Sequence, residues 1–125
     1  MRKFIIFLLL IAAVSYLTYD FISSGKCEEF ILSHSDKDWA PRALYYLGDI
    51  YLIFGDRKRA EGVYKKVIEK YPKSKYCEKA MFMHYYIPAY EGNSKETVRR
   101  GKKYLKRFPD SERAHRIRKR INVLD

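Results

Sequence analysis

The sequence predicts an all-α protein, a short α-solenoid of antiparallel helix pairs that follows one apolar helix at the N-terminus. Three observations support this fold class: a frame of residues that recurs after 37 positions, apolar side chains spaced with a helical period, and an uncharged N-terminal run. Recurrence at a period of this size is typical of helical repeat arrays. Such arrays mostly bind other proteins, which directs the search for function towards partners.

The recurring frame divides most of the chain into two segments, residues 40–74 (repeat 1) and residues 75–110 (repeat 2). The positions that match are mainly those expected in turns and at helix ends. The matching pairs are Gly55 with Gly92, Asp56 with Asn93, Lys58 with Lys95, Tyr71 with Phe108, Pro72 with Pro109, and Ser74 with Ser111. We therefore expect both segments to start and stop their helices at equivalent places.

Residues 1–25 are predicted to form a signal anchor, that is, a transmembrane helix. Arg2 and Lys3 precede an uncharged run over residues 4–19, and Asp20 ends that run. A spanning helix needs roughly 20 apolar residues, so this run lies at the short end of the range. A cleaved secretory signal is the alternative, because small residues suited to cleavage are present. The run is long for a signal core, which favours the anchor.

The basic start predicts that the N-terminus stays in the cytoplasm and the remainder is exported. We expect a single-pass protein of the inner, cytoplasmic membrane, with a helical repeat domain over residues 26–125 in the periplasm. A lipoprotein signal is a poor match, because Lys26 rather than a small residue precedes Cys27. Export permits a disulfide between Cys27 and Cys77. We expect free thiols instead, since positions a repeat apart on a solenoid are too distant for a bridge.

Repeat 1 is predicted to contain two helices. The first covers residues 40–54, and Pro41 falls in its first turn, where a missing N–H costs nothing. Gly55 and Asp56 then break the chain, with Gly55 suited to a left-handed cap. The second covers about residues 58–70. The inner faces comprise Leu44, Leu47, Ile50, Tyr51, Phe54, Ala60, Val63, Tyr64, Val67 and Ile68.

Repeat 2 is predicted to contain one helix from about residue 75 and another over residues 95–107. Pro88 should kink the first of these helices or end it early, because proline lacks an N–H and clashes with the preceding turn. Ser111 is suited to cap a last helix over residues 112–124. This capping segment, residues 111–125, would close the exposed end of the stack. Its apolar side comprises Ile117, Ile121 and Leu124.

Seven positions of repeat 1 fall at a spacing known from one family. They are Leu44, Leu47, Gly48, Tyr51, Ala60, Tyr64 and Pro72. This spacing resembles the tetratricopeptide repeat (TPR). The closing residues 71–74 are similar in style to bacterial envelope members, the outer-membrane assembly lipoproteins and Tol–Pal-type proteins. The frame also extends back to a half repeat, residues 26–39, and we expect the membrane helix to run nearly continuously into it, with a kink at Gly25.

Repeat 2 departs from the family pattern at several positions, among them Pro88 in place of Tyr51 and Thr97 in place of Ala60. Where repeat 1 has Gly48 and Tyr64, repeat 2 has Tyr85 and Gly101. We expect that the large and the small side chain have changed places between the two helices of the pair.

The resemblance implies that the first helix of each repeat lines a concave, protein-binding groove. It assigns to that groove Arg42, Tyr45, Tyr46, Asp49, Leu52, Ile53, Lys79, Phe82, Met83, Tyr86 and Tyr90, to which the capping helix adds Arg116, Lys119 and Arg120. Tyrosine and arginine often carry interface energy, but Tyr45, Tyr86 and Tyr90 could equally fill core. Asp49 replaces an asparagine of the family's carboxylate clamp and would repel a C-terminal tail. We therefore expect an extended or helical protein segment as ligand.

A basic patch dominates the C-terminal part of the chain. Residues 95–120 contain twelve lysines and arginines but only three acidic residues, and this excess accounts for most of the net charge of +11. The patch comprises Arg99, Arg100, Lys102, Lys103, Lys106, Arg107, Arg116, Arg118, Lys119 and Arg120. A solvated helix face explains it as well as an anionic lipid or an acidic partner does. Export and the lack of a motif argue against nucleic acid.

No catalytic, metal or cofactor site is predicted. His34, His84 and His115 are far apart and lack ligand-type neighbours, and neither a phosphate loop nor a nucleophile elbow occurs. We expect a non-enzymatic adaptor, an accessory or scaffold subunit of a membrane or envelope complex. The alternatives are a secreted or periplasmic envelope-assembly factor after signal cleavage, and a binder of anionic lipid or cell-wall polymer through the basic patch.

Overall fold

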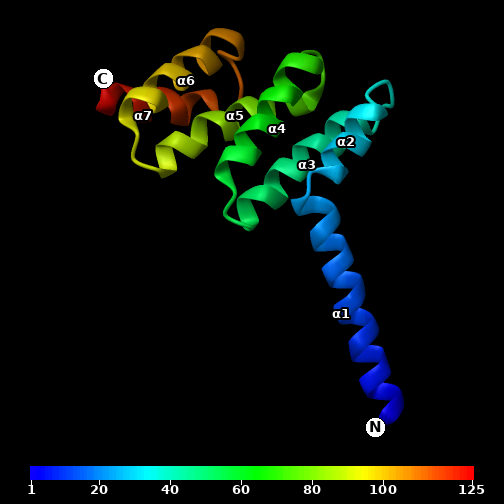
Figure 1. Cartoon of the computed structure of the whole chain (residues 1–125). Coiled ribbons are helices and arrows are strands. Elements are labelled where there is room, and N and C mark those ends of the chain that lie inside the picture. Colours follow the sequence, from blue (N-terminus) through cyan, green and yellow to red (C-terminus); the bar gives the residue numbers. More distant parts are fainter. The chain divides into compact units, whose positions relative to one another are not determined.

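The computed structural model describes residues 1–125 and is built from helices alone (Figure 1). Their order is α1 (Arg2–Ser23), α2 (Lys26–Ser33), α3 (Ala40–Ile53), α4 (Arg57–Lys70), α5 (Lys75–Tyr90), α6 (Ser94–Arg107) and α7 (Ala114–Leu124). The predicted all-α fold of sequential helix pairs is confirmed. The chain divides into two compact units, residues 1–40 and residues 41–125, which we describe separately.

In the first unit, α1 is the one helix of the protein that is long and apolar enough to cross a membrane. None of its residues is buried. The helix is interrupted at the position expected for the kink: α1 ends at Ser23, α2 begins at Lys26, and Gly25 between them has a φ of +85°. A residue in this left-handed conformation cannot continue a right-handed helix, and glycine adopts it without steric cost.

The turns of the second unit follow the predicted repeat frame. Gly55 and Gly92 have φ values of +78° and +77° and end their helices in equivalent ways. The next residue caps the following helix in each repeat: Asp56 accepts a hydrogen bond from the Arg59 backbone N–H (3.1 Å), and Asn93 accepts one from Glu96 (3.2 Å). Side-chain oxygens at this position satisfy N–H groups that the first helical turn leaves without partners.

The side-chain equivalence fails at the last matching pair, the two serines. Ser74 caps α5 by accepting a hydrogen bond from the Tyr76 N–H (3.2 Å). Ser111 does not cap α7, because its hydroxyl lies 2.6 Å from the Tyr104 hydroxyl instead. The last helix consequently begins at Ala114 rather than at residue 112, without a side-chain cap. Ile117 and Ile121 are buried as expected, whereas Leu124 is 39% exposed.

Pro88 does not end α5 early, because the helix continues to Tyr90 with the proline inside it. Proline has no N–H to donate to the carbonyl four residues before it, which here is His84. Arg100 of α6 supplies the missing donor, with its Nη1 atom 2.7 Å from the His84 carbonyl oxygen. A side chain from the neighbouring helix therefore replaces the lost backbone bond.

The predicted exchange of large and small side chains is confirmed. A Cβ atom at Gly48 would lie 2.5 Å from the Tyr64 ring, so α3 and α4 approach closely only because residue 48 is glycine. In the second pair the ring belongs to Tyr85, and a Cβ atom at Gly101 would lie 3.3 Å from it and 2.8 Å from Ile121 of α7. Around the second pair, one buried cluster comprises Cys77, Met81, Tyr85, Tyr104, Ala114, Ile117 and Ile121.

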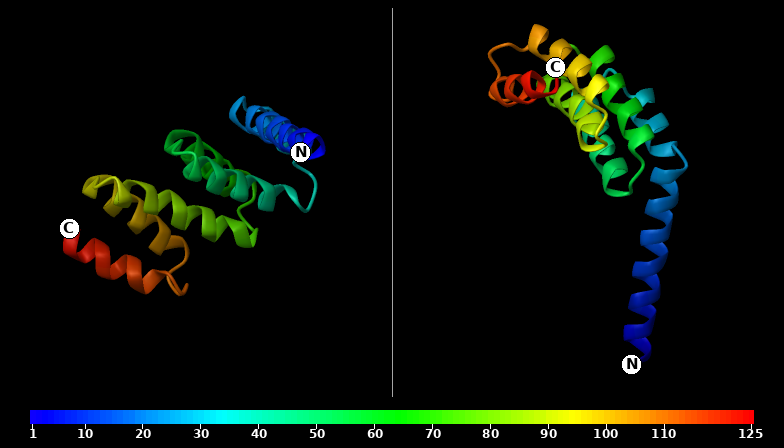
Figure 2. Two further views of the ribbon diagram at one scale, coloured as in Figure 1. Left: turned by 90° about the horizontal axis from the view of Figure 1, so that it is seen from below. Right: turned by 90° about the vertical axis from the view of Figure 1, so that its left-hand side faces the viewer.

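The second unit has two sides. Figure 2 shows successive helices side by side: α4 packs on α5, α5 on α6, and α6 on α7. On one side, hollows are lined by side chains of α3, α5 and α7 and by Arg57 at the start of α4. On the other side, a hollow is lined by side chains of α4 and α6 and by His84 of α5. Both cysteines, Cys27 and Cys77, are free thiols.

Candidate protein-binding surface

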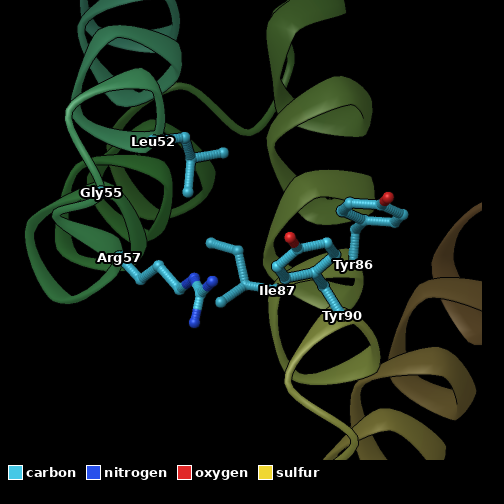
Figure 3. A pocket seen from close by; sticks show the side chains of 6 residues that line it. All are labelled: Leu52, Gly55, Arg57, Tyr86, Ile87 and Tyr90. Atoms are coloured by element: carbon cyan, nitrogen blue, oxygen red, sulfur yellow. The ribbon is translucent and has the colours of Figure 1, made fainter.

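Two adjoining hollows lie on the side formed by α3, α5 and α7. The first has a volume of about 240 Å³ and is lined by Leu52, Gly55, Arg57, Tyr86, Ile87 and Tyr90 (Figure 3). The second has a volume of about 200 Å³ and is lined by Phe82, Tyr85, Tyr86, Arg116, Ile117 and Arg120. Tyr86 borders both, so we treat them together as one groove.

The apolar part of the groove is a row of rings on α5. Phe82, Tyr86 and Tyr90 follow one another at four-residue intervals, which places them on one face of the helix. Their ring centroids lie 6.2 and 6.3 Å apart. Tyr86 is 42% exposed and Tyr90 is 66% exposed. Rings left this accessible are not used to fill the core and are available to a ligand.

Arginines border the row of rings. The Arg57 guanidinium lies 4.9 Å from the centre of the Tyr90 ring and 3.6 Å from a Glu91 carboxylate oxygen. Arg116 lies over Phe82, 5.9 Å from the ring centre. Arg120 donates a hydrogen bond to the Ala89 carbonyl oxygen (3.2 Å). No acidic residue lines either hollow, so the groove is positive.

Other residues assigned to the groove lie elsewhere. Tyr45 and Tyr46 form a separate aromatic cluster with Tyr76, with ring centroids 5.6 and 6.2 Å from the Tyr76 ring. Asp49 accepts a hydrogen bond from the buried Tyr64 hydroxyl, and burial together with this bond raises the pKa of Tyr64. Exposed or half-buried positions that line neither hollow are Arg42, Ile53, Lys79, Met83 and Lys119.

The basic patch does not form one continuous surface, because several of its arginines bind backbone carbonyl groups. Besides Arg100 and Arg120, Arg107 donates to the Pro72 carbonyl oxygen (2.9 Å) and Arg118 donates to that of Pro109. The two prolines close the two repeats, so their carbonyls lie at helix ends that lack helical donors. Of the remaining residues, Arg99 binds Glu96 through two hydrogen bonds, and Lys102 pairs with Asp125 (2.7 Å).

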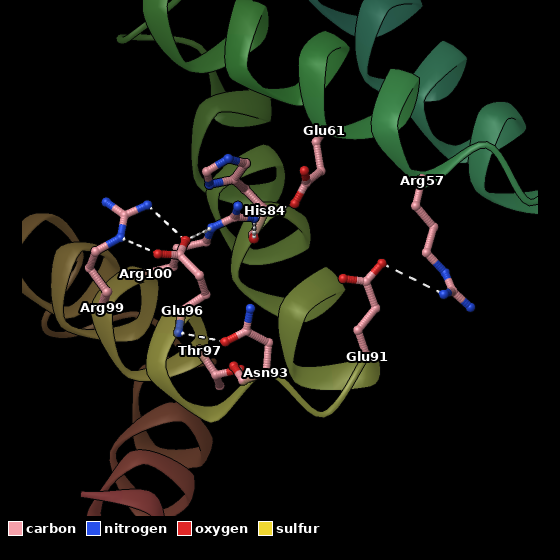
Figure 4. A network of polar contacts seen from close by, with 9 residues as sticks. All are labelled: Arg57, Glu61, His84, Glu91, Asn93, Glu96, Thr97, Arg99 and Arg100. Atoms are coloured by element: carbon pink, nitrogen blue, oxygen red, sulfur yellow. Dashed lines mark hydrogen bonds and ion pairs between the residues drawn. The ribbon is translucent and has the colours of Figure 1, made fainter.

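Arg100 and His84 lie at the centre of a polar network between α4, α5 and α6 (Figure 4). Besides the His84 carbonyl, Arg100 binds Glu61 (2.5 Å) and Glu96 (3.0 Å). Burial, followed by the charge of Arg100, lowers the pKa of His84 to about 4. Hydrogen bonds from Arg99 and Arg100 lower the pKa of Glu96 to about 2. At neutral pH the histidine is therefore neutral and the carboxylate charged.

The sequence did not identify two features of the second unit. The first is Arg57, which the sequence pattern placed in the turn before the second helix and to which it gave no role in binding. The second is Gly62 of α4, which leaves a hollow beside Lys58 and Lys65 on the side of α4 and α6. A glycine inside an amphipathic helix was the available signal for that hollow. No group of three or more metal-ligating side chains is positioned to hold an ion.

The family model for the tetratricopeptide repeat matches residues 42–74. The matched residues comprise nearly all of α3, the whole of α4 and the turn that precedes α5. The search of curated proteins found no match for this chain. Repeats of this kind typically form non-catalytic scaffolds for protein–protein interaction.

Proposed function

We propose that this protein is a membrane-anchored, extracytoplasmic adaptor that binds a segment of a partner protein in the groove of α3, α5 and α7. The observation that carries the proposal is the shared position of Tyr86 between two hollows, within a row of exposed rings on α5. Exposed tyrosines beside arginines are typical of interface hot spots. The role we assign is an accessory or scaffold subunit of a membrane or envelope complex.

The lining of the groove favours one kind of occupant. Arg57, Arg116 and Arg120 contribute positive charge, and the rings between them contribute apolar surface. A segment with a large apolar side chain flanked by acidic residues complements both properties. Two adjoining hollows suit two such side chains on one segment, either extended or helical.

The test is selection of peptides from a random display library against the full chain in detergent micelles. Enriched peptides should combine acidic residues with large apolar ones. The Tyr86→Ala variant should bind them at least about tenfold more weakly, because a hot-spot side chain contributes about 2 kcal/mol or more.

The matched control is Tyr46→Ala. Tyr46 is 48% exposed and also lies on the second unit, but it lines neither hollow. It should bind the selected peptides like the wild type. Equal losses in both variants, or a library that yields no common pattern, would remove the groove as the binding site.

The anchor is the second part of the proposal. A helix rises about 1.5 Å per residue, so the 22 residues of α1 span about 33 Å, close to the ~30 Å hydrocarbon core of a bilayer. Arg2 and Lys3 would hold the N-terminus in the cytoplasm and place the repeats outside it. The intact mass of the native protein from membranes tests this. A mass that corresponds to loss of about the first 25 residues would instead favour a secreted assembly factor.

A further inference from the structure

We propose that a second site, the cleft between α4 and α6, binds a small phosphate-bearing group. The cleft is defined by Lys58, Glu61, Gly62 and Lys65 of α4, His84 of α5, and Arg99, Arg100 and Lys103 of α6, and its volume is about 360 Å³. It lies on the other side of the array from the groove and shares no residue with it. The site is therefore independent of the function proposed above.

The cleft exists because α4 carries a glycine in its middle. A Cβ atom at Gly62 would meet nothing within 4 Å, so residue 62 leaves space where any other residue would project. Glycine inside a helix is less favourable than alanine, because it loses more backbone entropy on folding. Its conformation here does not demand glycine, since its φ is not positive. The open space is therefore the feature that glycine provides at this position.

The charges around the cleft are unbalanced. Five basic residues and one acidic residue line it. The acidic one, Glu61, is bound by Arg100 at 2.5 Å. Glu96 pairs with Arg99 and Arg100, which leaves the three lysines as the unbalanced charges. Lys58 and Lys103 form no ion pair, and Lys65 reaches Glu69 only at 3.9 Å. Several like charges that face one hollow repel each other, and a multivalent anion relieves that repulsion.

The polar groups at the cleft are those that bind phosphate. Lysine ammonium groups act as point charges, and Lys58, Lys65 and Lys103 supply them here. The Arg99 guanidinium is already held by Glu96 through two hydrogen bonds. The positive charges also act on His84: burial lowers its pKa most, and Arg100, Lys103 and Arg99 lower it further against the opposite effect of Glu61. A doubly charged phosphate beside this ring would raise its pKa.

The group that the cleft would bind is a phosphate with two or more negative charges. It could belong to a free phosphate compound or to a lipid headgroup, and both present the same oxygens to the cleft.

The first arm of the test is calorimetric titration of pyrophosphate into the full chain in phosphatidylcholine nanodiscs. The variant Lys58→Gln/Lys103→Gln removes two unpaired charges, and Gly62→Leu fills the space while every charge stays. Both should weaken binding at least about tenfold. The control Lys70→Gln/Lys106→Gln removes the same charge from exposed lysines of the same two helices that do not line the cleft, and it should bind within about twofold of the wild type.

Three results would overturn the proposal. The first is a Gly62→Leu variant that binds pyrophosphate like the wild type, because the cleft would then not be the site. The second is an equal loss in the control, which would indicate diffuse attraction by net charge. The third is a wild-type protein that shows no heat of binding at millimolar pyrophosphate and whose His84 ring signals are also unchanged by phosphatidic acid.

The second arm identifies the source of the phosphate. The readout is the nuclear magnetic resonance signals of the His84 ring. A free phosphate compound is indicated when the signals shift on addition of pyrophosphate and are the same in phosphatidylcholine discs with and without phosphatidic acid. A lipid headgroup is indicated when phosphatidic acid alone shifts them. In either case the shift should be absent in Gly62→Leu.

Discussion

At the scale of single residues, the arginines of α6 and α7 serve the backbone as much as the surface. Arg100 is 14% exposed and binds one carbonyl and two carboxylates. The carbonyl it binds is free because Pro88 has no N–H. Arginine can do this because its guanidinium has five donors in a fixed plane, which lysine lacks. The proline and the arginine therefore form one structural unit, although they lie on different helices.

This unit predicts a coupling between two substitutions. Arg100→Gln should lower the free energy of unfolding by about 2–3 kcal/mol, because a carbonyl and two carboxylates lose their charged donor. In a Pro88→Ala background the helix regains an N–H for the His84 carbonyl, and the same substitution should cost about 1 kcal/mol less. Urea unfolding of the four chains measures the coupling. Strictly additive costs would contradict the pairing of Pro88 with Arg100.

At the scale of helices, two glycines inside regular helices have opposite roles. Gly48 of α3 allows the Tyr64 ring to approach, and Gly62 of α4 faces open space. Gly48→Ala should therefore lower the free energy of unfolding by about 1–3 kcal/mol through overpacking. Gly62→Ala should raise it by about 0.5–1 kcal/mol, because alanine favours the helix and meets no neighbour.

Thermal unfolding of the two alanine variants compares them directly. The midpoints should move in opposite directions from that of the wild type. A fall in both midpoints would mean that the space beside Gly62 is not open in solution.

The helices were largely predictable from the sequence, and the failures have identifiable causes. The periodic apolar positions and the glycine–Asp/Asn turns located α3 to α6 to within a few residues. The start of α7 was missed because a tertiary partner, Tyr104, occupies the Ser111 hydroxyl. The passage of α5 through Pro88 could not be predicted from local rules, because the donor that compensates for the proline comes from another helix. Local rules do not contain such long-range partners.

The candidate surfaces were less predictable for the same reason. The face of α5 could be placed from its period, and Phe82, Tyr86 and Tyr90 indeed line the hollows. Tyr46 and Asp49 lie on the equivalent helix of repeat 1. Asp49 accepts a hydrogen bond from Tyr64 of α4, and the Tyr46 ring packs against that of Tyr76 of α5. The residues of the basic patch were grouped because they are close in sequence. In the structure some of them bind backbone carbonyl groups, some form ion pairs, and some line the cleft.

At the scale of the whole molecule, stability should depend on pH through one histidine. In the folded chain the pKa of His84 is about 4, against an ordinary value of 6.5. The unfolded state therefore takes up a proton between these values while the folded state does not. Stability from this group is complete above about pH 6.5, is lost as the pH falls towards 4, and changes no further below that.

The measurement is the free energy of unfolding at pH 7.0 and pH 4.5 for the wild type and for His84→Gln. The wild type should lose about 1–2 kcal/mol more than the variant, a value that allows for the partial exposure of the ring. In a short array, whose total stability is small, this is a substantial fraction. Parallel losses in the two chains would mean that carboxylates alone determine the acid sensitivity.

The opposite placement of Tyr64 and Tyr85 relative to their glycines has a consequence for how the chain selects its own partners during folding. If α5 took the place of α3 beside α4, two tyrosine rings would compete for one space. If α3 took the place of α5 beside α6, Gly48 would leave the space of the Tyr85 ring empty. Each helix of a repeat therefore packs well only against the other helix of the same repeat. The two repeats are similar in outline but cannot be interchanged, which protects a repetitive chain against misassembly with itself or with a second copy.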